Sequence, residues 1–81
     1  MKKLEGIKIM VSYKPLWKTL IDKGITKTQL REMVGCSTST LARLGKDEFV
    51  GMDLICKICY ALNCKIEDVV EVVPENGVTL P

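Results

Sequence analysis

Apolar residues follow two different periods along this chain. Near the start, apolar residues at every second position predict a short strand over residues 6–11. Residues 69–73 are rich in β-branched side chains and stop at Pro74, which predicts a second strand. Between the two, apolar residues recur every three or four positions, as in helices with one buried face. The pattern therefore predicts a mostly helical domain with a short strand near each end.

The first helix is predicted to begin after Ser12, whose hydroxyl can cap the open N–H groups, and to end at Gly24. Pro15 is tolerated in its opening turn, because no N–H is needed there. We expect its tryptophan to be the largest block of the core, not an exposed residue that stacks on nucleic-acid bases. The inner face of this helix is predicted to comprise Leu16, Trp17, Leu20 and Ile21.

A later helix is predicted over residues 52–62, with an apolar face broad enough to make it the central, largely buried helix. Phe49 or Val50 is expected to return the chain to the core before it. Asn63 can take the left-handed conformation that ends it, and residues 66–70 allow one or two more helical turns. The predicted face comprises Leu54, Ile55, Ile58, Cys59, Ala61 and Leu62.

Residues 25–44 predict two short helices joined by a tight turn, which is a helix-turn-helix. Thr26 is placed to cap the first of these helices, and Gln29, three residues on, completes a capping box. Gly35 follows the last apolar residue of that helix, where the chain must turn sharply. A left-handed backbone is predicted there, because glycine adopts it without steric cost.

The second helix of the pair is predicted over residues 37–44, with Ser37 as its cap. Leu41 and Leu44 are expected to face the core. The outward face then carries small hydroxyls and one arginine, which suits the major groove of DNA. Hydroxyls bond to phosphates or base edges there, and an arginine can hold a guanine with two hydrogen bonds. The outward residues are Thr38, Ser39, Ala42 and Arg43.

These residues resemble the helix-turn-helix of the Cro and phage-repressor (XRE) family of bacterial regulators. Residues 50–71 are similar to the fourth and fifth helices of its small single-domain members, so the resemblance covers about residues 16–71. It implies an all-α fold, a compact five-helix phage-repressor-like domain, with the short strands added at the two ends. The residues that carry the likeness are Thr26, Leu30, Gly35, Ser37, Leu41 and Leu44.

Domain boundaries follow from the same reading. Residues 1–11 are predicted to be a tail and short strand, residues 12–71 the DNA-binding domain, and residues 72–81 the end of the second strand and a tail that includes a turn at 75–77.

Three positions depart from the family's pattern. Lys27 stands where the family has glutamine, but a lysine can still meet a phosphate as a point charge. Arg31 stands where a small alanine lets the two helices pack closely, so its charge must reach solvent or find a carboxylate. The link over residues 45–50 is shorter than usual.

The resemblance implies a sequence-specific regulator of transcription that binds double-stranded DNA. A protein-interaction module on the same scaffold, binding another regulator, is the alternative. An enzyme is disfavoured, because the chain has no histidine and no glycine-rich phosphate loop. By their place in the family's pattern, the residues expected to approach base edges are Thr38, Ser39 and Arg43. Those expected to contact the DNA backbone are Thr26, Lys27, Ser37 and Lys46.

The charge distribution strengthens the DNA hypothesis more than the net charge of +2 does. Residues 1–46 hold ten Lys or Arg and three Asp or Glu, a balance of +7, whereas residues 47–81 have a balance of −5. The basic half contains the helix-turn-helix, as phosphate binding requires.

Four cysteines raise the question of a redox or metal site, because Cys56 and Cys59 form a C-K-I-C motif. The motif lies in mid-helix, however, whereas a redox pair normally sits at a helix N-terminus. A zinc site would need all four cysteines, since no histidine is present. Structural cysteines are therefore favoured, and we expect no metal and no cofactor.

No apolar run approaches the roughly 20 residues of a spanning helix, and the first ten residues lack a signal-peptide pattern. The sequence thus favours a cytoplasmic protein that does not contact membranes. Its two predicted strands must pair, because unmet backbone groups are costly. Either they pair with each other, which is the arrangement favoured, or they are exchanged between two chains of a homodimer.

Overall fold

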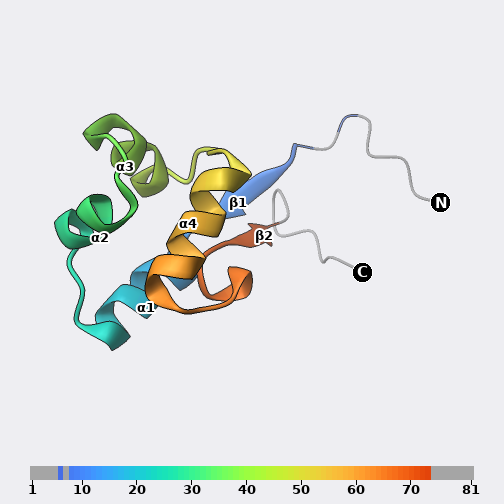
Figure 1. Cartoon of the computed structure of the whole chain (residues 1–81). Coiled ribbons are helices and arrows are strands. Elements are labelled where there is room, and N and C mark those ends of the chain that lie inside the picture. The colour runs from blue at the N-terminus through green and yellow to red at the C-terminus, as the bar shows by residue number, and fades with distance from the viewer. Residues whose placement is uncertain (1–5, 7, 74–81) are drawn as a thin grey trace.

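A computed structural model describes residue 6 and residues 8–73 of the chain (Figure 1). Figure 1 shows α4 in the middle of the molecule, with α2 and α3 together on one side and the paired strands on the other. In chain order the elements are β1 (Met10–Ser12), α1 (Lys14–Lys23), α2 (Lys27–Val34), α3 (Thr38–Gly45), α4 (Met52–Leu62), the 3₁₀ helix η1 (Ile66–Asp68) and β2 (Glu71–Val73).

The two strands pair with each other in antiparallel register, with Met10 opposite Val73 and Ser12 opposite Glu71. The pairing predicted within one chain is therefore confirmed, but each strand is shorter than predicted. Val69 and Val70 do not join the sheet, because both of their N–H groups bond to the carbonyl of Ile66. Ile7 and the turn predicted at 75–77 lie outside the described residues.

The prediction of a fifth α-helix is wrong. Residues 66–70 form only the three-residue 3₁₀ helix η1, so the described chain has four α-helices and a two-stranded sheet. Val69 still has a right-handed helical backbone, with φ of −118° and ψ of −48°, so the turn runs only one residue past η1, and the β-branched side chains of Val69 and Val70 disfavour a longer helix. The chain enters β2 at Glu71.

The core is built around α4, as its apolar face predicted. This helix buries Ile55, Ile58 and Leu62, and each of the other helices adds one or two leucines. Two residues outside the helices, Tyr13 before α1 and Val69 after η1, complete the core. The buried residues from the rest of the chain are Tyr13, Leu16, Leu20, Leu30, Leu44 and Val69.

The inner face of α1 differs from the prediction. Ile21 is 79% exposed, because it follows Leu20 by one residue and thus lies about 100° farther round the helix. Trp17 is only half-buried at the edge of the core, and Tyr13, at 2% exposed, takes the central place instead. Tyr13 precedes Leu16 by three residues, so it extends the leucine stripe below the first turn.

The start of α1 also corrects the predicted cap. Tyr13 occupies the N-cap position, but its side chain makes no capping hydrogen bond to the helix, and Ser12 ends β1. The Ser12 hydroxyl still accepts the N–H of Lys14, the first residue of the helix, at 3.2 Å. Ser12 does so from the position before the N-cap. Pro15 lies in the first turn, as expected. At the other side of the core, Phe49 is exposed and the half-buried Val50 makes the return.

Candidate nucleic-acid interface

The start of α2 carries the predicted capping box. The Thr26 hydroxyl accepts the Gln29 N–H at 3.1 Å, and the Gln29 side-chain oxygen accepts the Thr26 N–H at 2.8 Å. Both residues are exposed, as is Lys27 between them. The first turn of α2 is thus ordered at the surface by its own side chains, with a positive charge beside it.

The turn between α2 and α3 takes the left-handed backbone predicted at Gly35, with φ of 72°. Its N–H and that of Cys36 both bond to the Arg31 carbonyl, at 2.8 and 3.2 Å. No atom lies within 4 Å of where a β-carbon would stand on Gly35. Glycine is therefore required there for its backbone conformation and not for space.

Hydroxyl groups gather at the start of α3. The Ser37 oxygen accepts the Thr40 N–H at 3.2 Å, which confirms the predicted cap, and it lies 2.9 Å from the Ser39 hydroxyl and 3.0 Å from that of Thr40. Thr38 is exposed beside them. Hydroxyls both donate and accept, so this cluster can exchange its internal hydrogen bonds for bonds to an external oxygen.

The two faces of α3 are divided as predicted. Leu44 is buried and Leu41 packs against the core, whereas the four residues predicted to face outward are all exposed. Apart from Ala42, the outward face of α3 is therefore polar.

Arg43 is fastened to the loop that follows α3. Its Nε lies 3.7 Å from a Glu48 carboxylate oxygen, and its guanidinium donates to the Phe49 carbonyl. The side chain of Arg43 remains 52% exposed. Sequence reasoning identified Arg43 as the long donor of this face but not its partners, which an external acceptor would have to share or replace.

Tyr13 anchors that same loop from the far side. Its N–H donates to the Asp47 carboxylate at 3.0 Å, and its hydroxyl donates to the Glu48 carbonyl at 2.8 Å. Asp47 has φ of 56°, a conformation that aspartate tolerates better than most residues. Burial raises the pKa of the Tyr13 hydroxyl above its usual value of 10.0. The loop that carries Lys46, exposed at the end of α3, is thereby tied to the start of α1.

Known proteins with the same sequence pattern and fold agree with this geometry. The model of the Cro/C1-type HTH DNA-binding domain matches residues 15–75. The chain belongs to this helix-turn-helix family. It is also similar to the crystal structure of the transcriptional regulator VanUg, with 45% sequence identity and a TM-score of 0.83 over 93% of this chain and 100% of that one. No curated protein matches. The predicted resemblance is confirmed.

At the two family positions where this Cro/C1-type domain departs from the usual residue, the structure places long cations. The Lys27 ammonium lies 4.4 Å from the centre of the Trp17 ring, within range of a cation–π interaction. Arg31 is half-buried and makes no ion pair with any described residue. A carboxylate partner, one of the two expected ways to accommodate its charge, is thus not found in the described chain.

The predicted DNA-contact residues of this Cro/C1-type domain lie at three helix ends. Thr26 and Lys27 are at the start of α2, Ser37 and its neighbours at the start of α3, and Arg43 and Lys46 at the end of α3. Figure 1 shows α2 and α3 lying next to each other, so the three ends belong to one side of the molecule. No helix in the described part of the chain is long and apolar enough to span a membrane.

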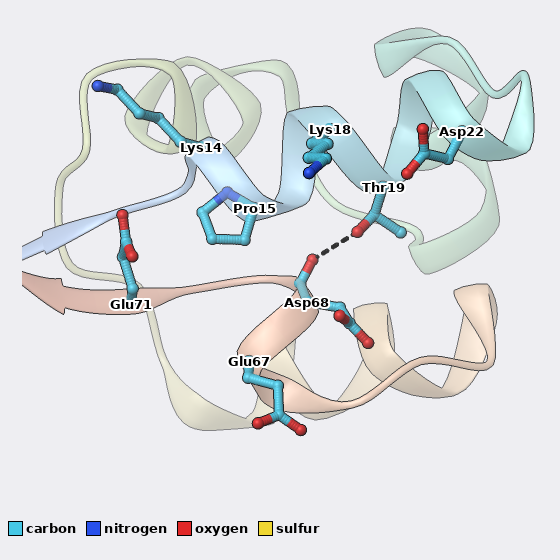
Figure 2. A pocket seen from close by; sticks show the side chains of 8 residues that line it. All are labelled: Lys14, Pro15, Lys18, Thr19, Asp22, Glu67, Asp68 and Glu71. Atoms are coloured by element: carbon cyan, nitrogen blue, oxygen red, sulfur yellow. Dashed lines mark hydrogen bonds between the residues drawn. The ribbon is translucent and has the colours of Figure 1, made fainter.

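The hollow in Figure 2 lies elsewhere, between α1 and η1. Carboxylates of both elements line it together with Lys14 and Lys18, and the Thr19 hydroxyl crosses it to donate to the Asp68 carbonyl at 2.8 Å. Its mixed charges offer no preference for a phosphate. The Thr19 hydrogen bond instead fastens η1 onto α1.

Proposed function

We propose that this protein is a sequence-specific regulator of transcription that binds double-stranded DNA with α3 in the major groove. Its family is one of DNA-binding domains, and the solved structure that it resembles is described as a transcriptional regulator. The observation that carries the proposal is the outward face of α3, which is polar apart from Ala42, while Leu41 and Leu44 hold the helix on the core. An α-helix with such a face fits the width of the major groove.

Base reading is assigned to Thr38, Ser39 and Arg43. Residues at the start of a recognition helix reach farthest toward the base edges, and hydroxyls accept or donate according to the base they meet. Arg43 is the long donor that can hold a guanine through two N–H groups. To do so it exchanges both Glu48 and the Phe49 carbonyl for the base. The exposed ion pair is worth only about 0–1 kcal/mol, whereas a bidentate guanine contact discriminates against the wrong base by about 1–3 kcal/mol.

Backbone contacts are assigned to Thr26, Lys27, Ser37 and Lys46. Thr26 and Ser37 cap helix N-termini, where open N–H groups and the helix dipole favour a phosphate. The Trp17 ring restrains Lys27 at the first of these ends, so its ammonium loses less freedom on binding. Lys46 supplies a charge at the far end of α3.

The decisive experiment begins with selection of bound duplexes from a random DNA pool. Recovery of an inverted repeat, with half-sites about 34 Å apart, would indicate that a homodimer binds. Affinity for the selected site is then measured over a range of salt concentrations, for the natural chain and its variants.

Arg43→Ala is expected to cost about 1–3 kcal/mol of binding free energy and to relax preference at one base pair per half-site. Lys27→Ala and Lys46→Ala should weaken all sequences alike and each lower the salt slope by about one unit. Lys57→Ala is the matched control, because Lys57 is an exposed lysine on α4 in the acidic half of the chain, and it should leave affinity and salt slope unchanged.

The opposite result is equally clear. If no duplex is bound with salt dependence, or if folded Arg43→Ala protein keeps both affinity and preference, then α3 is not the reading helix. The protein-interaction module becomes the better proposal in that case.

A further inference from the structure

The end of α4 is closed by two backbone hydrogen bonds around Asn63, which has the left-handed φ of 50°. The Cys64 N–H donates to the Cys59 carbonyl at 3.0 Å, and the Asn63 N–H donates to the Tyr60 carbonyl at 3.3 Å. This pair of bonds is the Schellman motif, which a side-chain contact between the two residues joined by the outer bond frequently accompanies. In this chain both of those residues are cysteines.

The surroundings of the two thiols agree with that contact. Cys59 and Cys64 are both half-buried against the core, and both line one surface hollow beside Tyr60. Burial raises the pKa of the Cys64 thiol, and the neighbouring Cys59 thiol raises it further. The pair is thus packed together and still open to a small solute from the hollow.

The remaining cysteines are less well placed for a bond to either member of the pair. Cys56 lies one turn before Cys59 within the same regular helix, where β-carbons stand about 5–6 Å apart. A disulfide needs about 3.5–4.5 Å between them, so this pair would have to distort the helix. Cys36 belongs to the turn between α2 and α3.

We propose that Cys59 and Cys64 form a dithiol that hydrogen peroxide converts into an intramolecular disulfide. Because burial disfavours the thiolate of Cys64, the first attack is given to the thiolate of Cys59. An S–O bond forms, the O–O bond of the peroxide breaks and one water is released after proton transfer. The second thiol attacks the resulting sulfenic acid, forming the S–S bond and releasing the second water. Each sulfur gives up one electron, and the peroxide takes up both. A thiol reductant reverses the step by exchange.

The Cys64 N–H bond to the Cys59 carbonyl already holds these two residues together at the end of α4, and the disulfide adds a covalent link between them. It locks the end of α4 to the segment that leads into η1, which Thr19 in turn holds on α1. This proposal does not depend on DNA binding.

Tryptic mapping of the full chain distinguishes the possible bonds, because Lys57 separates Cys56 from the other two. The reduced protein is treated with one equivalent of hydrogen peroxide, blocked with an alkylating reagent and digested. A Cys59–Cys64 bond lies within peptide 58–65 and makes it lighter by two hydrogens, whereas a bond from Cys56 to either of these cysteines joins that peptide to peptide 47–57. Any bond to Cys36 joins peptide 32–43 to one of the other two. We expect the closed peptide to exceed the joined pair by about tenfold.

The variants test the assignment by residue. Cys56→Ser and Cys36→Ser should still form the closed peptide, and dithiothreitol should reopen it. Cys59→Ser and Cys64→Ser should not form it. The proposal is overturned if the joined peptides dominate in the natural chain, if bonds between two molecules form first, or if peptide 58–65 carries sulfinic acid without closing. These readings come from the natural chain and stand even if a variant fails to fold.

Discussion

The helix-turn-helix is stabilised mainly by local hydrogen bonds, and the rest of the domain mainly by buried apolar side chains. Helices α2 and α3 each bury a single leucine, whereas α4 buries three residues and α1 two. What the helix-turn-helix lacks in burial it makes up with local hydrogen bonds, namely two side-chain caps and a glycine turn. A segment that turns so few side chains inward keeps most of its surface free, which is what a binding face needs.

The largest effect is expected in the core. Ile58→Ala removes a side chain that is 0% exposed on α4 and should lower the free energy of unfolding by about 2–5 kcal/mol, by lost burial and a cavity. Urea unfolding followed by circular dichroism measures it. Tyr60→Ala, at a residue 92% exposed on the same helix, should change stability by less than about 0.5 kcal/mol. Equal effects at the two positions would contradict the central place of α4.

Two glycines test the local backbone conformation within the helix-turn-helix. Gly35→Ala should lower the free energy of unfolding by about 1–2 kcal/mol, because alanine is strained at φ of 72°. Gly45→Ala should raise it by about 0.5–1 kcal/mol, since Gly45 is the last residue of α3 and the added methyl meets open space. Urea midpoints that move in the same direction for both variants would contradict the role given to the left-handed backbone at Gly35.

The cap of α2 is the next step down. Thr26→Ala should cost about 1 kcal/mol of unfolding free energy, because the Gln29 N–H loses its acceptor. Thr28→Ala is the matched control, being an exposed threonine two residues on that caps nothing, and should leave stability unchanged or slightly higher. Thermal melting compares the two, and a tie between them would argue that caps contribute little to this half.

The smallest effect on stability is expected at Tyr13, which links the start of α1 to the loop after α3. Tyr13→Phe should cost about 0.5–1.5 kcal/mol near pH 7, because the Glu48 carbonyl loses its donor. The raised pKa of Tyr13 also makes stability depend on pH, because above pH 10.0 the unfolded chain releases the hydroxyl proton that the folded chain keeps. Stability therefore falls as pH rises from there through the folded pKa.

The phenylalanine variant has no such proton, so the stability gap between it and the natural chain should narrow above pH 10.0. Urea titrations at several pH values measure that gap. Tyr60→Phe, on an exposed ring, serves as the control for general alkaline effects. A gap that stays constant would contradict the linkage between this hydroxyl and folding.

Sequence alone was sufficient for the features that depend on residues a few positions apart. The capping box of Thr26, the turn at Gly35, the cap at Ser37 and the apolar face of α4 were all predicted correctly. Their hydrogen bonds and periodicity lie within one or two helical turns, so neighbouring residues determine them. Assignments of individual DNA contacts stay predictions.

Tertiary structure decided the features whose partners are distant in the chain. Tyr13 contacts residues 34 and 35 positions away, and only that contact explains its burial and the position of the loop after α3. The burial of Val69 after η1 and the pairing of β2 with β1 depend likewise on segments that are distant in the chain. Periodicity can state that a residue prefers burial, but the space for it exists only once the elements have packed, and residues 71–73 form a strand because β1 lies beside them to pair.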